Sequence, residues 1–311
     1  MTDTSALGSP RRPLDRPPDQ AARRPPPGAP APLSSPSELL ERLAPRLHRR
    51  PFLLVSDFDG TLAPLGLDPW GAAMAPRARR ALRRLSGMAG LSVAFVSGRT
   101  VADLSARVRV GGARYVGNDG LESGSLARSG RPDRVRVRSV AGFEPFVAPA
   151  TALADAVETA IGEPWLVVER KGPAVTFHYR GAPDVPSAGA RVRAAVDRLE
   201  RGGDFVRHQG ARMLELRPLG APTKADAVLR LLADVRPGLA LLLGDGGTDA
   251  AAFVALRSAA GGSTGELVAL SVAVRSHGDP LSTVEEAADA VLASTDAVAD
   301  LLGRMARALP A

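Results

Sequence analysis

The sequence predicts an α/β fold, in which a smaller α+β unit is inserted into a doubly wound parallel sheet. In the first and last parts of the chain, short apolar runs typical of buried parallel strands alternate with amphipathic helix patterns. In the middle, short strands and two longer helices follow a different order. The chain has 311 residues, of which 45% are hydrophobic, and this suits a two-part architecture with a sizeable core.

The predicted core consists of residues 37–125 and 217–311, which flank the middle segment. Before that segment, the expected elements are the strands 52–56, 91–96 and 114–117, a helix from about residue 76 and a helix over 101–108. After it, they are the helices 224–234 and 249–256, the strands 239–243 and 267–274, a short segment at 290–292 and a helix from 296.

The middle segment, residues 126–216, is predicted to form an inserted α+β cap domain. Its expected elements are a half-buried strand at 134–138, the helices 148–161 and 187–201, and the strands 165–169, 174–180, 204–208 and 213–217. Residues 1–36 are rich in Pro and Arg and predict a disordered tail, because they bury too little apolar surface to offset the ordering entropy. Ser37 is expected to cap a short helix through Leu47.

Composition excludes several classes of function. The net charge is +7, but the arginines are spread over helix faces and aromatic residues make up only 4%, so no nucleic-acid partner is expected. The absence of cysteine excludes disulfides and thiolate metal sites. No apolar run approaches the roughly 20 residues that a membrane helix needs, and the start has no apolar signal region. We therefore expect a cytoplasmic monomer without a membrane partner.

The run D-F-D-G-T-L, from Asp57 to Leu62, carries the strongest chemical signal. It follows an apolar strand directly, and ligands of open α/β sheets bind beyond the carboxyl ends of the strands. Two carboxylates at that place repel a phosphate unless a divalent cation lies between them, and Mg²⁺ prefers such oxygen ligands. An Asx-turn that ends a strand explains one aspartate and the glycine, but not the whole run.

This run resembles the first motif of the haloacid dehalogenase (HAD) superfamily of phosphohydrolases, which implies a HAD-like core. The resemblance implies that Asp57 is the nucleophile, which forms an aspartyl-phosphate, and that Asp59 is the general acid and base. Covalent catalysis divides a difficult displacement into two easier steps, and phosphate monoesters are among the slowest compounds to hydrolyse unaided.

The other motifs of the superfamily follow in order. V-S-G-R, at 96–99, matches the second motif, so the resemblance implies that Ser97 and Gly98 bind the phosphate at a helix start. Lys224 matches the lysine that neutralises the phosphate and the nucleophile. G-D-G-G-T-D, at 244–249, matches the fourth motif. It implies that Asp245 binds the metal together with Asp57 and the Asp59 carbonyl, and that Asp249 holds metal-bound water or orients Lys224.

Further motifs are similar to those of trehalose-6-phosphate phosphatases, over about residues 50 to 300. They are G-N-D-G-L-E at 117–122, E-R-K at 169–171, H-Y-R at 178–180 and E-L-R-P at 215–218. The resemblance implies that Lys171 and Glu215 of the cap bind sugar hydroxyls, with Arg99 and Asn118 as further substrate-binding residues. The chain has only two lysines, Lys171 and Lys224, and both fall within these motifs.

Three positions depart from the family pattern. Gly246 and Ala250 replace acidic residues of the fourth motif, and Asp119 replaces a histidine. Three functions therefore stay open: hydrolysis of trehalose 6-phosphate, the same chemistry on another sugar phosphate (sucrose-phosphate-like or glycosylglycerate phosphate), or sensing of a sugar phosphate without turnover. For the cap residues, a structural role is the alternative: Glu215 could pair with an arginine, and His178 could be an ordinary strand residue.

Overall fold

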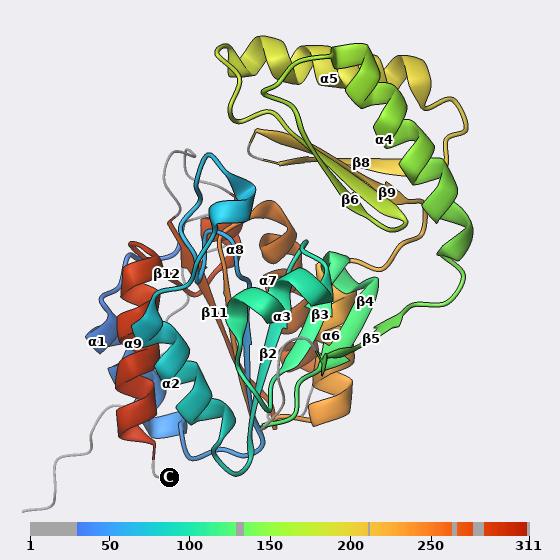
Figure 1. Ribbon diagram of the computed structural model, residues 1–311. Coiled ribbons are helices and arrows are strands. Elements are labelled where there is room, and N and C mark those ends of the chain that lie inside the picture. Colours follow the sequence, from blue (N-terminus) through green and yellow to red (C-terminus); the bar gives the residue numbers. More distant parts are fainter. Residues whose placement is uncertain (1–29, 129–133, 211, 263–265, 276–282, 310–311) are drawn as a thin grey trace, which may run out of the picture.

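The computed structural model describes residues 30–128, 134–210, 212–262, 266–275 and 283–309. Within this part of the chain the strands form two sheets, one large and one small, each with its own helices (Figure 1). None of the helices described is long and apolar enough to cross a membrane.

The large sheet has eight strands among the described residues, in the order β12-β11-β10-β1-β2-β3-β4-β5. Its strands are β1 (Phe52–Ser56), β2 (Leu91–Val96), β3 (Arg114–Gly117), β4 (Glu122–Ser125), β5 (Arg136–Ser139), β10 (Leu239–Gly244), β11 (Val268–Val274) and β12 (Ala290–Leu292). The strands from β12 to β3 are parallel, whereas β4 and β5 extend the sheet in antiparallel fashion.

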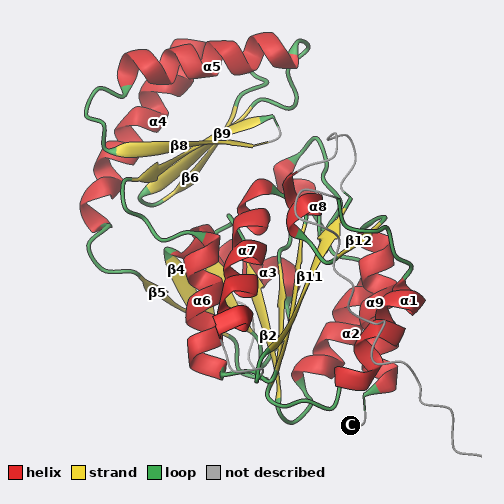
Figure 2. Ribbon diagram, turned by 180° about the vertical axis from the view of Figure 1, so that it is seen from behind, coloured by secondary structure: helices red, strands yellow, loops and turns green. Residues whose placement is uncertain are grey.

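Helices cover both faces of the parallel strands, which confirms the predicted doubly wound fold (Figure 2). One face carries α1 (Pro36–Leu43), α2 (Pro76–Ser86), α3 (Val101–Val108) and α9 (Thr295–Ala308). The other carries α6 (Lys224–Val235), α7 (Gly247–Gly262) and α8 (Thr283–Ala287). Strand β1 shows why both faces are apolar: Phe52 and Leu54 pack on the first face, and Leu53 and Val55 on the second.

The small sheet is antiparallel, in the order β6-β7-β9-β8. Its strands are β6 (Val167–Lys171), β7 (Ala174–His178), β8 (Phe205–Gly210) and β9 (Met213–Pro218). The helices α4 (Val147–Ile161) and α5 (Val185–Leu199) pack on one face, around Phe177, Val192 and Leu216. The other face is turned towards the large sheet (Figure 1). The separate-domain status of this unit, and its limits at 126 and 216, stay predictions.

Three expectations differ from the structure. The strand predicted at 134–138 forms as β5, but it pairs with β4 of the large sheet and is exposed rather than half-buried. Ser35, not Ser37, caps the first helix, because Glu38 completes a capping box with it, and this helix ends at Leu43. Residues 1–29 of the predicted tail lie outside the described residues, but Ala31 is buried and Leu33 forms a β-bridge with Val291, so order begins before residue 36.

Candidate active site

A cavity of about 930 Å³ lies between the two sheets. We call its lower side the floor; it consists of Asp57, Asp59, Ser97, Lys224, Asp245 and Asp249. We call its upper side the ceiling; it consists of Glu169, Lys171, Thr176, His178 and Glu215 on the small sheet. Most of the predicted site residues thus lie on two opposing walls of one cavity, and their roles stay predictions.

The floor forms where neighbouring parallel strands end. Ser56, the last residue of β1, lies opposite Leu243 of β10 and Phe95 of β2. The residues that follow these strands, Asp57, Asp245 and Ser97, therefore meet at one edge of the sheet. Residues far apart in sequence become neighbours because parallel strands present all their carboxyl ends on the same side.

Gly60 allows the closest approach within the floor. Its φ is +76°, and a Cβ at this position would lie 1.8 Å from Oδ2 of Asp245. Any side chain here would displace Asp245, so the glycine of the D-F-D-G-T-L run is required by space as well as by backbone conformation. The Thr61 hydroxyl then donates to Oδ1 of Asp245 at 3.3 Å.

Lys224 is the central cation of the floor. It begins α6, where Thr223 and Asp226 form a capping box that fixes the helix start. Its Nζ donates to Oδ1 of Asp57 and to Oδ1 of Asp249, both at 2.9 Å. Burial alone would lower the pKa of Lys224, but the two carboxylates outweigh it and raise the pKa well above its usual value. The two carboxylates thus favour the charged form of Lys224.

Three carboxylates surround this single lysine. Asp57, Asp245 and Asp249 offer ligand atoms that all lie within 4.8 Å of one another. Burial raises the pKa of Asp57 well above its usual value; Lys224 opposes this, and Asp249 and Asp245 add to it. The cluster thus has more negative charge than its lysine balances, and a hard divalent cation with oxygen ligands fits it. The carboxylate of Asp59 is not part of this cluster; its carbonyl stays a predicted ligand.

Asp249 connects the metal cluster to the backbone of the fourth motif. Its Oδ2 accepts from the amides of Asp245 and Gly246, at 3.3 and 3.1 Å. Gly246, one of the three departures, therefore still supplies a backbone donor that fixes Asp249. The loss of an acidic side chain at this position leaves the cluster of three carboxylates assembled.

The second motif lies beside Asp59. Ser97 is buried, and its Oγ accepts from the Arg99 amide at 3.2 Å. Gly98 lines the cavity, and its carbonyl accepts from Nζ of Lys171 at 3.0 Å. Arg99 also lines the cavity, and its guanidinium binds both carboxylate oxygens of Asp59, at 2.6 and 2.7 Å.

The ceiling is built from residues that alternate along neighbouring strands. Thr176 of β7 lies opposite Glu169 of β6 and opposite Glu215 of β9. Lys171, two residues after Glu169, points to the same face and forms a buried ion pair with Glu215. Burial opposes the charge of Lys171, but Glu215 and Glu169 outweigh it and raise the lysine pKa above its usual value of 10.5.

Several buried polar atoms of strand β7 and its extension have no hydrogen-bond partner within the described part of the chain. They are Oγ1 of Thr176, Nδ1 of His178 and Nε of Arg180. The other ring nitrogen of His178 bonds Oε2 of Glu169 at 3.0 Å. Burial opposes the charge of Glu169, but His178 and Lys171 outweigh it and lower the pKa of Glu169. Since buried unpaired polar atoms are costly, this face fits a ligand rich in hydroxyl groups.

Asn118 and Asp119 join the floor to the ceiling. Both have a φ of 48°, a conformation that asparagine and aspartate tolerate better than most residues. Asn118 donates to the carbonyl of Lys171 at 3.0 Å, and Asp119 accepts from Arg217 at 3.0 Å in a buried ion pair. The contact of Asn118 is thus with the cap backbone, and Asp119 has an arginine partner from β9.

Comparison with known proteins identifies the family. A sequence profile described as trehalose-phosphatase matches residues 55–286. The chain belongs to the trehalose-phosphatase family. This family match confirms the resemblance found in the motifs.

Two curated relatives illustrate the match. The chain is 36% identical over 216 residues to an uncharacterized glycosyl hydrolase of Mycobacterium tuberculosis, a match that covers 67% of this chain and 15% of that protein. It is 32% identical over 216 residues to a trehalose-phosphate phosphatase of Mycobacterium bovis, with coverage of 68% and 53%. The match therefore spans about half, or much less, of the length of these relatives.

Solved structures agree on the fold. The C-terminal domain of trehalose-6-phosphate phosphatase from Candida albicans superposes with a TM-score of 0.71 and 23% identity, over 90% of this chain and 99% of that one. A haloacid dehalogenase-like hydrolase from Bacteroides thetaiotaomicron gives a TM-score of 0.51 and 18% identity, over 81% and 98%. The predicted HAD-like fold is thus confirmed.

Sequence reasoning missed part of the site. Glu169 was noted only as part of a motif, although the period of two along β6 places it on the same face as Lys171. Thr176 gave no signal, because its position depends on pairing with β6 and β9. Arg99 pairs with Asp103, which in turn pairs with Arg107 one helical turn later on α3, a spacing that is also common on solvated helix surfaces.

Proposed function

We propose that the chain is a Mg²⁺-dependent phosphatase that hydrolyses trehalose 6-phosphate to trehalose and phosphate. One observation carries the proposal: Lys224 bridges Asp57 and Asp249 on the floor of a cavity whose opposite wall is a polar sheet face. Family membership supports the reaction, and the hydroxyl-compatible ceiling supports a sugar as the leaving group.

In the proposed first step, a carboxylate oxygen of Asp57 attacks phosphorus, and the bond from phosphorus to the sugar oxygen breaks. Asp59 gives a proton to that oxygen, so the sugar leaves as an alcohol. Lys224, held within 2.9 Å of Asp57, balances negative charge at the nucleophile and the phosphoryl group. Ser97 and Gly98 are proposed to bind the phosphoryl oxygens from the other side.

In the proposed second step, Asp59 takes a proton from water, which attacks the aspartyl-phosphate and releases phosphate. Asp57, Asp245 and Asp249, with the carbonyl of Asp59, would hold Mg²⁺, directly or through water. When bound, the ion supplies positive charge that offsets the repulsion between these carboxylates and the phosphate. Lys171, Glu215 and Asn118 are proposed to fix the sugar and the closed cap.

The test is phosphate release from trehalose 6-phosphate in the presence of Mg²⁺, beside glucose 6-phosphate and sucrose 6-phosphate. We expect selective turnover of trehalose 6-phosphate that is lost with EDTA and in the Asp57→Asn variant. Turnover of another ester that depends on Asp57 would keep the chemistry and change the substrate. Binding of a sugar phosphate without any turnover would favour a sensor. A cytoplasmic monomer stays an expectation from the sequence.

A further inference from the structure

A loop forms a side wall of the cavity between the floor and the ceiling. We call residues 64–72 the wall loop. Its residues Leu65, Gly66, Asp68, Pro69 and Ala72 line the cavity. Trp70, by contrast, is 49% exposed. The loop contacts the ceiling side through Arg180, which donates to the Gly66 carbonyl at 2.7 Å.

Arg99 connects this wall loop to Asp59. Beyond its two bonds to Asp59, its Nη2 donates to the Pro69 carbonyl and its Nη1 to Oδ2 of Asp103, both at 2.7 Å. A guanidinium has five N–H donors. Four of those of Arg99 are thus used by Asp59, Pro69 and Asp103. This residue is only 7% exposed, and its contacts anchor the wall loop to Asp59; its role in substrate binding stays a prediction.

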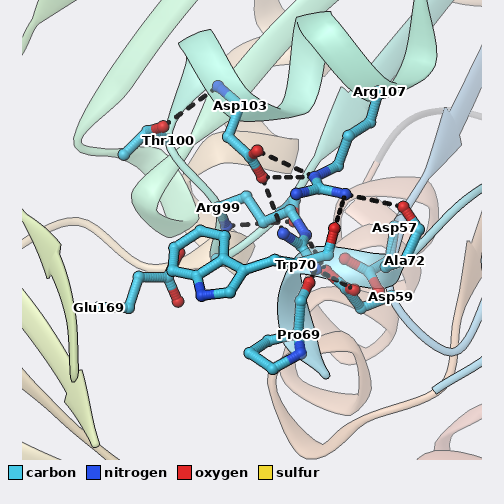
Figure 3. A network of polar contacts seen from close by, with 12 residues as sticks. Asp57, Asp59, Pro69, Trp70, Ala72, Arg99, Thr100, Asp103, Arg107 and Glu169 are labelled. Atoms are coloured by element: carbon cyan, nitrogen blue, oxygen red, sulfur yellow. Dashed lines mark hydrogen bonds and ion pairs between the residues drawn. The ribbon is translucent and has the colours of Figure 1, made fainter. Parts of the chain in front are cut away.

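Arg107 contacts both Asp103 and the backbone of the wall loop (Figure 3). Its Nε donates to both oxygens of Asp103, at 2.9 and 2.7 Å. Its Nη1 donates to the carbonyls of Trp70 and Ala72, at 2.9 and 2.8 Å. Arg107 is not among the described residues that line the cavity. It reaches the site only through Asp103 and Arg99, and through the loop backbone.

We infer that Arg107 is a positioning residue: through Asp103 and Arg99 it fixes the position of the Asp59 carboxylate relative to the wall loop. This inference rests on the proposed role of Asp59 as general acid and base. Asp59 has further lone pairs beyond those that accept from Arg99, and its side chain is 31% exposed. Loss of Arg107 removes its hydrogen bonds to Asp103 and to two carbonyls of the wall loop. Asp103 then no longer holds Arg99 in one orientation, and Arg99 no longer orients the Asp59 carboxylate.

A comparison of two leaving groups distinguishes a misplaced Asp59 from a general loss of structure, which would lower the activity with both. A sugar leaves as a poor leaving group and needs a proton from Asp59, whereas p-nitrophenolate leaves without one. The ratio kcat/KM covers only the steps up to release of the first product, so the second use of Asp59 does not enter it. A misdirected Asp59 therefore lowers kcat/KM for a sugar phosphate more than for p-nitrophenyl phosphate.

The experiment compares Arg107→Ala with Arg304→Ala in a Trp165→Phe background. Arg304 forms the same kind of pair, with Asp300 four residues earlier, on a helix away from the cavity. Trp70 is then the only tryptophan, since the chain has two. We expect Arg107→Ala to lower kcat/KM for trehalose 6-phosphate by about tenfold to a hundredfold, with a smaller loss for p-nitrophenyl phosphate. Acrylamide should also quench Trp70 more strongly, and Arg304→Ala should change neither.

Equal losses with both esters, or unchanged quenching of Trp70, would overturn the proposal. Arg107→Lys is the second variant if the alanine variant does not fold: it keeps the charge but lacks the planar fork, so both effects should persist in part. If the parent protein is inactive on every ester, the proposed function is wrong, and the inferred role of Arg107 falls with it. If the parent protein hydrolyses another sugar phosphate, the same comparison is made with that substrate in place of trehalose 6-phosphate.

Discussion

The floor and the ceiling of the cavity are both polar and buried, but they differ in how their groups are partnered. On the floor, Lys224 bonds two carboxylates at once, and Asp249 is further fixed by backbone amides. On the ceiling, Thr176 and His178 each keep a buried atom without a partner among the described residues. No side-chain atom of the floor is among the buried unpaired atoms of the described residues, whereas the ceiling has hydrogen-bonding capacity left for a ligand.

This difference suggests separate roles for the two walls: the floor would carry out the reaction, and the ceiling would discriminate between substrates. In the proposed reaction the floor acts on the phosphoryl group, which every phosphate ester carries. An incomplete ceiling gains most from a ligand that satisfies its unpaired atoms, and discrimination is strong where buried polar groups would otherwise stay unpaired. Changes at Asp57 and Lys224 should thus affect all esters alike, and changes at Asp59 should depend on the leaving group. Changes on the ceiling should affect only esters with a matching sugar.

The largest effect is expected when the nucleophile on the floor is removed. Asp57→Asn keeps the shape of the side chain but cannot form the aspartyl-phosphate, so kcat should fall by about 10⁴-fold or more. The loss should be the same for trehalose 6-phosphate and p-nitrophenyl phosphate, measured as phosphate release. Retention of more than a small part of the activity with either ester would show that Asp57 is not the nucleophile.

Replacement of the floor cation comes next. Lys224→Met leaves Asp57 and Asp249 without the ammonium that they share, so we expect kcat to fall by about 10² to 10³-fold with both esters. Steady-state kinetics at saturating Mg²⁺ measure this. A loss confined to the sugar phosphate would place Lys224 with the ceiling instead.

Removal of the ion pair between Asp119 and Arg217, which joins the floor to the ceiling, should mainly lower the stability of the fold. Asp119→Ala leaves Arg217 buried with its Nη1 unpaired, and such a loss costs about 3 kcal/mol of unfolding free energy. Urea denaturation at neutral pH measures it. The exposed pair removed by Arg304→Ala should cost about 0.5 kcal/mol or less, and equal effects of the two variants would contradict the structural role of Asp119.

The smallest predicted effect concerns pH. Contact with His178 and Lys171 lowers the pKa of Glu169 in the folded protein below its usual value of 4.5. Its contribution to stability is therefore present above pH 4.5 and is lost as the pH falls through the lowered pKa. Urea denaturation of the wild type and Glu169→Gln should show a difference in unfolding free energy that shrinks on acidification below that pH. A difference that grows there would contradict the assignment.

The place where the floor residues meet could be predicted from the sequence, because these residues follow the strands directly. The motif D-F-D-G-T-L places a turn and two carboxylates directly after a strand, so the position of these residues at the carboxyl edge follows from local pattern and parallel pairing. The fold class could be predicted for the same reason: apolar runs and helix patterns are local signals.

The rest depended on contacts between distant residues. Thr176 joins the ceiling only because β7 pairs with β6 and β9 in one register. Strand β5 was assigned to the inserted unit because an alternating run does not tell which sheet it will join. The contacts of Arg99 could not be predicted, because a motif names a residue but not its partners. These partners, Asp59, Asp103 and Pro69, come from three separate segments.

The most direct test of this division between floor and ceiling is the ratio of kcat/KM for trehalose 6-phosphate to that for p-nitrophenyl phosphate in Glu215→Gln. Glu215 is buried on the ceiling, where it pairs with Lys171, and the substitution keeps its shape but replaces the carboxylate by a neutral amide. We expect the ratio to fall by about tenfold or more, because a charged hydrogen-bonding partner of the sugar is lost while the floor is intact. An unchanged ratio would contradict the account, because the ceiling would then have no part in choosing the substrate.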